Sequence, residues 1–134
     1  MDLEYSVDLS YPVADANTIK GFMENIRLRI LLVEDDEDDY IIIRSFLPEI
    51  KAPHFELDWV RTYAAGLEEM VANRYDAYLI DYRLGPANGL DLLREATSKG
   101  CNRPVIILTG QGDQQVDLEA MEAGAAEYLI KDQL

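Results

Sequence analysis

An apolar run that ends in acidic residues constrains this chain more than any other feature. Ile30 to Val33 are four consecutive apolar residues, and Glu34, Asp35 and Asp36 follow them directly. A parallel strand buried on both faces has such an unbroken apolar sequence, and ligands of open α/β sheets bind beyond the carboxyl ends of the strands. Carboxylates held close together repel one another unless a cation neutralises them, and Mg²⁺ prefers oxygen ligands. The run therefore predicts either a cation site or the solvated start of a helix, where acidic residues are also favoured.

Length and composition narrow the class of protein. A chain of 134 residues, with 49% hydrophobic and 28% charged residues, is expected to form one globular domain. The net charge of −14 argues against partners such as nucleic acid or an anionic membrane. No signal peptide opens the chain and no apolar stretch approaches the roughly 20 residues of a membrane span, so we expect a cytoplasmic protein. The single Cys101 fits a reducing compartment, and with His54 as the only histidine a Cys–His nucleophile has little support.

Strand and helix signals alternate from Arg29 onward, at the spacing of an α/β protein. The expected strands are Ile30–Val33, Phe55–Val60, Tyr75–Ile80, Pro104–Leu108 and Ala126–Ile130. The expected helices are Glu37–Leu47, Tyr63–Ala72, Gly89–Ser98 and Asp113–Ala123. Right-handed crossovers between these strands predict a doubly wound, five-stranded parallel sheet in the flavodoxin-like order 2-1-3-4-5. Since only three residues follow Lys131, the closing helix that is usual on such a sheet is expected to be missing.

Residues 1–28 are expected to form an amino-terminal arm ahead of a domain over residues 29–134. Alternating apolar and polar residues over Leu3–Leu9 predict a short strand. An amphipathic helix is predicted from a stripe made of Ile19, Phe22, Met23 and Ile26. Our hypothesis is that this helix covers the sheet face left bare by the missing last helix. A flexible arm, a shortened chain, or an arm that packs on a second copy in a homodimer are the alternatives.

Four of the predicted strands end in residues that suit phosphate chemistry. They are Glu34 and Asp35 after the first strand, Asp81 after the third, Thr109 after the fourth and Lys131 after the fifth. Parallel strands bring these ends to one edge of the sheet, and phosphoryl transfer depends mostly on positioning and charge stabilisation. The acids would hold Mg²⁺, while Lys131 and Thr109 would each contact a phosphoryl oxygen. Asp81 would be the nucleophile, because a carboxylate is ionised at pH 7 and can form an acyl phosphate.

The motifs at these strand ends resemble the receiver domain of two-component response regulators. They are Leu32-Val33-Glu34-Asp35, Leu79-Ile80-Asp81 with Gly89 eight residues on, Leu108-Thr109-Gly110 and Tyr128-Leu129-Ile130-Lys131. The resemblance implies that Asp81 accepts a phosphoryl group from the phosphohistidine of a sensor histidine kinase or a histidine phosphotransfer protein. It also implies an output domain or partner protein that the sequence does not name. Such a domain promotes its own phosphorylation and dephosphorylation and is not otherwise an enzyme.

The resemblance also implies a role for each residue of the site. Asp35 would be a direct Mg²⁺ ligand, Glu34 would act through a water, and the backbone carbonyl of Arg83 would be a further ligand. Thr109 would be the switch hydroxyl, and Tyr128 the aromatic side chain that turns inward after phosphorylation. A loop cap and ordinary strand packing are the alternatives for these two residues.

The charged side chains next to these motifs are not predicted to bind the cation directly. Asp36 lies one position past the matching acid pair and receives no direct ligand role. Asp38 and Asp39 are predicted to be the solvated start of a helix. The side chain of Arg83 is predicted to reach the pocket rim, and our hypothesis is that it influences how water approaches the acyl phosphate.

Two departures from the family pattern concern the loops. Asp132 stands where the family usually has proline, and Pro86 comes one residue later than usual. Together with the missing closing helix, these altered loops leave a receiver-like interaction module that works without phosphorylation as one alternative. A phosphatase of the haloacid dehalogenase type is another, because Asp36-Glu37-Asp38 has the Asp-x-Asp spacing, although it starts two residues past the expected site.

Overall fold

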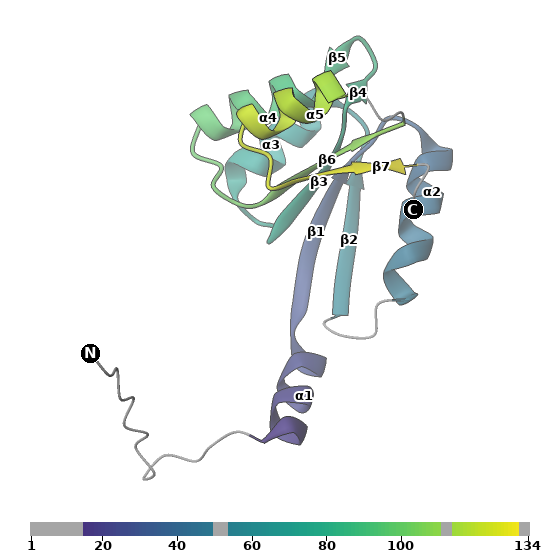
Figure 1. Cartoon of the computed structure of the whole chain (residues 1–134), viewed down its shortest axis with the longest axis vertical. Helices are drawn as coiled ribbons and strands as arrows, with labels where there is room; N and C mark the ends of the chain where they lie inside the picture. Colours follow the sequence, from purple (N-terminus) through teal and green to yellow (C-terminus); the bar gives the residue numbers. More distant parts are fainter. Residues whose placement is uncertain (1–14, 50–53, 111–113, 132–134) are drawn as a thin grey trace, which may run out of the picture.

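A five-stranded parallel sheet forms the centre of the computed structural model, which describes residues 15–49, 54–110 and 114–131 (Figure 1). Its strands are β1 (Arg27–Val33), β2 (His54–Val60), β3 (Ala77–Asp81), β6 (Val105–Thr109) and β7 (Glu127–Ile130). Their order is β2-β1-β3-β6-β7, and every neighbouring pair is parallel. The predicted doubly wound order 2-1-3-4-5 is thus confirmed. A two-stranded antiparallel hairpin, which the sequence analysis did not foresee, is made of β4 (Arg83–Leu84) and β5 (Ala87–Asn88).

Helices lie on both sides of this sheet (Figure 1). The described helices are α1 (Ala16–Asn25), which lies off both faces, α2 (Glu37–Phe46), α3 (Tyr63–Ala72), α4 (Gly89–Ser98) and α5 (Gln114–Glu122), with a short 3₁₀ helix η1 (Leu47–Glu49) after α2. Figure 1 shows α3, α4 and α5 on one side and α2 on the other. None of the helices in the described ranges has the length and hydropathy that a membrane span requires.

Side-chain caps fix where the helices start. The Asp36 carboxylate accepts the backbone N–H of Asp38 at 2.9 Å, and the Asn88 side-chain oxygen accepts the N–H of Leu90 at 2.7 Å. Thr62 caps α3 through the N–H of Ala65. Each cap satisfies a donor that the helix itself leaves unpaired. Because α2 and α4 begin just beyond strand ends, these caps also place their first turns beside the carboxyl edge of the sheet.

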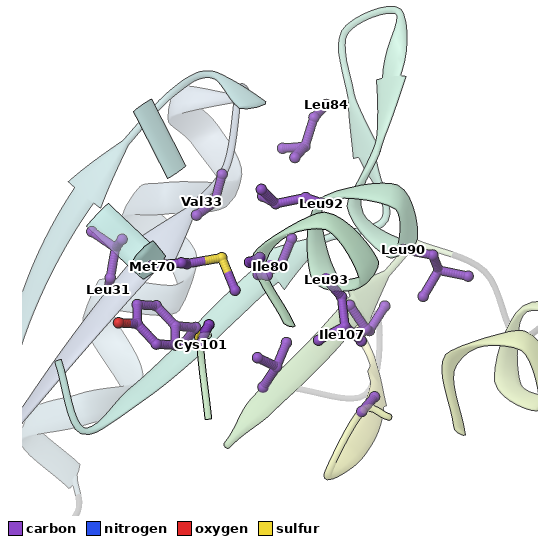
Figure 2. Packing of buried hydrophobic residues seen from close by; sticks show 14 of the residues in the cluster. Leu31, Val33, Met70, Ile80, Leu84, Leu90, Leu92, Leu93, Cys101 and Ile107 are labelled. Carbon is purple, nitrogen blue, oxygen red and sulfur yellow. The ribbon is translucent and has the colours of Figure 1, made fainter. Parts of the chain in front are cut away.

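The apolar run of β1 is buried on both faces. Leu31 and Val33 point into the larger core cluster, on the side of α3 and α4, where Figure 2 shows them near Met70 and Ile80. Leu32 points the other way and packs with Ile43 of α2 in a second cluster. Residues 31–33 have no exposed surface. Burying each such side chain contributes about 1.5–3 kcal/mol, so β1 is a rigid support for the acids that follow it.

The third strand begins later than expected. It starts at Ala77, whereas the sequence predicted a start at Tyr75. The Tyr75 ring is buried and its hydroxyl donates a hydrogen bond to the Asp58 carboxylate at 2.6 Å. Asp76 binds the backbone N–H of Arg29 through its side chain at 2.8 Å. These side-chain contacts anchor the approach to β3 together with a backbone hydrogen bond from the Asp76 N–H to the Arg29 carbonyl at 2.8 Å.

The prediction that the amino-terminal helix covers a bare sheet face is wrong. Helix α1 passes directly into β1 through Ile26, and Figure 1 places it beyond the start of β1, away from the sheet faces. It has no buried residue, and Ile19 and Phe22 are 53% and 67% exposed. With a single residue between the two elements, the helix has no loop that could turn it back. The predicted strand over Leu3–Leu9 and the predicted absence of a closing helix concern chain outside the described residues, and the division at residue 29 stays a prediction.

Gly89 is needed where α4 starts under the end of β3. Its backbone N–H donates to the carbonyl of Tyr82 at 2.7 Å, and an added Cβ would overlap the carbonyl oxygen of Asp81. Gly89→Ala should therefore lower the free energy of unfolding by ~2 kcal/mol, as overpacking does elsewhere. Urea denaturation followed by circular dichroism measures the change. Gly21→Ala is the control, because no atom outside its own helix lies within 4 Å of an added Cβ there; equal stability of the two variants would contradict the prediction.

Candidate functional site

A pocket of about 500 Å³ lies at the carboxyl ends of β1, β3, β6 and β7. Its lining consists of Glu34, Asp35, Asp36, Asp39, Asp81, Tyr82, Arg83, Thr109, Gly110 and Lys131. The structure thus brings together all the strand-end residues that the sequence analysis selected. They meet here because parallel strands direct their carboxyl ends to the same edge of the sheet.

The ammonium group of Lys131 lies between three carboxylates. Its Nζ is 2.9 Å from Glu34 Oε2, 2.9 Å from Asp81 Oδ1 and 2.7 Å from Asp39 Oδ2. The side chain of Glu34 has no exposed surface, and those of Asp81 and Lys131 are 8% and 14% exposed. Removing charges from water costs several kcal/mol each, and this cost is offset only when the charges are paired. One ammonium cannot neutralise three carboxylates, so the pocket keeps an excess of negative charge.

The structure corrects the prediction for Asp39. This residue was expected to be solvated with Asp38, but only Asp38 is exposed, whereas Asp39 faces the pocket and pairs with Lys131. Asp36 caps α2 and Asp39 lies three residues later, which is the spacing that puts two side chains on one face of a helix. That spacing was visible in the sequence, but the direction in which the helix leaves β1 was not. Since Asp36 is committed to the cap and Asp38 is exposed, the Asp-x-Asp phosphatase alternative gains no support.

Three carboxylates lie close enough together that they could hold a divalent cation. One oxygen from each of Glu34, Asp35 and Asp81 lies within 4.8 Å of the others. Asp35 Oδ2 accepts the backbone N–H of Gly85 at 2.9 Å, so the turn between β4 and β5 holds this side chain. Gly85 has φ +61°, in the left-handed region that suits glycine. The late Pro86 therefore belongs to a hairpin that reaches the pocket. Oxygen donors of this type suit Mg²⁺ or Ca²⁺.

Trp59 supports Glu34 from the neighbouring strand, a contact that the sequence analysis missed. Its indole Nε1 donates to the backbone carbonyl of Glu34 at 2.7 Å, and its ring stacks on Tyr40 with 4.0 Å between centroids. Glu34 Oε1 accepts the N–H of Asp36 at 3.2 Å. These contacts fix Glu34 at the end of β1. Because Trp59 is the only tryptophan, its fluorescence reports on this position.

Burial controls the protonation of the acids. It raises the pKa of Glu34 to about 7, and the nearby charge of Asp81 adds to the rise while Lys131 opposes it. Burial likewise raises the pKa of Asp81. Burial alone would lower the pKa of Lys131, but hydrogen bonds to Asp39, Glu34 and Asp81 outweigh it and raise that pKa. Near pH 7 the Glu34 carboxyl, with a pKa of about 7, is therefore partly protonated, and a cation bound beside it would favour the ionised form.

The two predicted switch residues lie in different surroundings. Thr109 ends β6, is buried and lines the pocket. Tyr128 lies on β7 and is half-buried against the larger core cluster, on the side of α3, α4 and α5. The register pairs Thr109 with Ile130 and Ile107 with Tyr128, so Thr109 and Tyr128 lie on adjacent strands, two residue positions apart along the strand direction. The side chain of Arg83 is exposed at the pocket rim, as expected.

The family model of the response regulator receiver domain matches residues 30–133. This chain belongs to that family, and it is a receiver domain of two-component response regulators. It is 35% identical over 104 residues to the transcriptional regulatory protein QseB of Escherichia coli O157:H7, which covers 78% of this chain and 46% of QseB. It is 33% identical over 107 residues to the response regulator RppA of Synechocystis, covering 78% of this chain and 44% of RppA. The chain thus spans about half the length of the curated relatives it matches.

Solved structures agree with the fold. The non-phosphorylated HemR receiver domain from Leptospira biflexa is 34% identical, with a TM-score of 0.66 over 78% of this chain and 82% of that chain. The phosphorylated cyanobacterial phytochrome response regulator RcpA has a TM-score of 0.70 over 81% of this chain and 86% of its own, and at 24% identity it shows the fold alone.

The raised pKa of Glu34 predicts a pH dependence of stability in the presence of a chelator. Between its usual pKa of 4.5 and the folded value of about 7, the folded protein binds more protons at Glu34 than the unfolded chain does. Stability from this group is therefore present below pH 4.5 and is lost as the pH rises to 7. Glu34→Gln, which mimics the protonated acid, should gain stability relative to the parent over this range, by on the order of 2 kcal/mol. Urea denaturation of both proteins at pH 5 and pH 8 measures the difference; a gap that does not widen would contradict the prediction.

Proposed function

We propose that this chain accepts a phosphoryl group on Asp81 from the phosphohistidine of a sensor histidine kinase or a histidine phosphotransfer protein. The observation that carries the proposal is that Asp81 ends β3 in one pocket with two further cation-binding carboxylates, Thr109 and Lys131. In the transfer, a carboxylate oxygen of Asp81 attacks phosphorus as the phosphorus–nitrogen bond breaks. The imidazole keeps the electron pair of that bond and takes up a proton.

The proposal includes Mg²⁺ as the cation. Asp35 and Asp81 would hold it with their carboxylates, Glu34 would act through a water, and the backbone carbonyl of Arg83 would complete the protein ligands. When bound, a divalent cation neutralises charge on the phosphoryl oxygens during transfer. Lys131 already contacts Asp81 Oδ1, so its ammonium has only a short distance to move to a phosphoryl oxygen. Burial of these groups excludes water and strengthens each electrostatic contact.

The phosphoryl group is proposed to act through Thr109 and Tyr128. A phosphoryl group adds a charge of roughly −1.5 to −2 and strong acceptor oxygens, to which the Thr109 hydroxyl can donate. Movement of Thr109 leaves space for the ring of Tyr128, and the surface over α5 and β7 then differs between the two states. A partner protein shifts the equilibrium between these two states only as far as its affinity for one state differs from its affinity for the other.

The output is proposed to lie in a further domain or a separate protein, because the roles proposed for the pocket residues all concern phosphorylation and the switch that follows it. QseB is named a transcriptional regulatory protein and is about twice as long as the matched region. A net charge of −14 opposes direct contact between this chain and nucleic acid. A cytoplasmic location belongs to the proposal, since phosphohistidine donors draw on ATP inside the cell. The exposed Ile19 and Phe22 of α1 make a second copy of the chain a candidate partner.

Phosphorylation can be tested without the kinase. Incubation with acetyl phosphate and Mg²⁺ should add the mass of one phosphoryl group to the intact protein, because the pocket itself supplies the chemistry. A chelator should prevent the addition, and Asp81→Asn should abolish it. If Mg²⁺ binds but neither protein gains the phosphoryl mass, the interaction module that works without phosphorylation becomes the better account.

Arg83 is proposed to shield the acyl phosphate from water. Its long side chain is exposed at the pocket rim, two residues after Asp81. Arg83→Ala should therefore speed the loss of phosphate at least about threefold, equivalent to ~0.7 kcal/mol in activation free energy. Intact mass followed over time after removal of acetyl phosphate measures the rate. Arg103→Ala, a change at an exposed arginine outside the pocket lining, is the control; identical rates for the two variants would contradict the shielding role.

A further inference from the structure

We propose that Asp39 is a positioning residue that keeps the ammonium group of Lys131 paired when a cation binds in the pocket. This inference rests on the proposed function, because it concerns binding of Mg²⁺ at the carboxylates of Glu34, Asp35 and Asp81. It assigns a role to a residue in the first turn of α2 that the receiver motifs of this chain do not include.

The three partners of Lys131 fall into two kinds. Glu34 and Asp81 belong to the carboxylate group whose oxygens lie within 4.8 Å of one another, and Asp39 does not. Asp39 nevertheless makes the shortest of the three contacts, at 2.7 Å against 2.9 Å for each of the others. Lys131 is thus shared between the proposed cation ligands and one carboxylate outside them.

A cation and the ammonium group would be drawn to the same two carboxylates, those of Glu34 and Asp81. Lys131 Nζ lies against Glu34 Oε2 and Asp81 Oδ1, so cation binding requires these contacts to weaken. The Lys131 side chain is only 14% exposed, and an ammonium left unpaired at such a depth is costly. Asp39 keeps one charge-assisted hydrogen bond to Lys131 throughout the exchange. Without Asp39, withdrawal of Lys131 leaves it unpaired, and the cation must overcome that cost.

The position of Asp39 is fixed independently of the cation ligands. The Asp36 cap sets the start of α2, and the 32% exposure of the Asp39 side chain leaves it partly solvated at the pocket wall. Asp39 can therefore accept the whole ammonium charge at a smaller desolvation cost than the buried Glu34. Helix α2 thus supplies Lys131 with a carboxylate partner that stays in place, while Glu34 and Asp81 exchange Lys131 for the cation.

Any acid near the pocket also attracts cations through its long-range field. Asp38 separates this general effect from the specific one, because it has the same charge on the same helical turn but is exposed and lies outside the pocket lining. Asp38→Asn measures the loss of one nearby charge. Asp39→Asn measures the same loss together with the loss of the Lys131 partner.

The test is isothermal titration of the full chain with MgCl₂, with folding of each variant checked by circular dichroism. Asp39→Asn should weaken Mg²⁺ binding at least about fivefold more than Asp38→Asn, as expected for one hydrogen bond to a charged group. In a Lys131→Met background, the two Asn substitutions should have equal effects, because the competing ammonium is gone. Lys131→Gln replaces Lys131→Met if the latter does not fold.

The outcomes separate this inference from the function on which it rests. Equal weakening by Asp39→Asn and Asp38→Asn in the parent chain would overturn the role of Asp39 while leaving Mg²⁺ binding intact. A difference that persists without Lys131 would also overturn it, since Asp39 would then act on the cation directly. A parent chain that binds no Mg²⁺ would overturn the proposed cation site and this inference together.

Discussion

The ion cluster around Lys131 is the interaction on which the rest of the site depends. Glu34, Asp39 and Asp81 lie so close together that their charges are tolerated only because one ammonium touches all three. The compensation is incomplete, since burial still raises the pKa of Glu34 to about 7. A structure selected for stability alone would avoid such a cluster, because well-packed apolar residues are often as stable as a buried ion pair. The excess of negative charge would favour binding of a cation in the pocket.

The fold holds this costly arrangement in place through rigid supports on several sides. Strand β1 is buried on both faces and carries Glu34 at its end, where the Trp59 indole holds the backbone carbonyl. The hairpin of β4 and β5 supplies the Gly85 N–H that orients Asp35. Close approach of Gly89 to Asp81 lets α4 begin directly beneath β3. Each support comes from a different element, so the positions of the acids are determined by the tertiary structure as a whole.

The parts of this structure that were predictable are those that depend on local sequence. Apolar runs predicted the strands, strand spacing predicted the sheet order, and the shared edge of the parallel strands predicted the meeting of Glu34, Asp81 and Lys131. Contacts set by tertiary geometry were missed. Asp38 and Asp39 are neighbours in the sequence, and only the packing of α2 determines that Asp39 faces the pocket while Asp38 is exposed. The hydrogen bond from Gly85 to Asp35 joins residues that are fifty positions apart in the chain. The apolar stripe of α1 predicted a helix, but a stripe does not specify what covers it, and its direct connection to β1 leaves it exposed.

Asp81, and no other acid of the cluster, is proposed to carry the phosphoryl group. Three carboxylates share one small volume, so a mass change alone does not locate the acyl phosphate. Reduction with borohydride converts an acyl phosphate into the corresponding alcohol, and peptide mapping by mass spectrometry then gives its position. Our account predicts that, after treatment with acetyl phosphate and Mg²⁺, homoserine is found at position 81 only. Homoserine at position 35, or a reduced glutamate at position 34, would contradict the assignment of Asp81 as the phosphoacceptor.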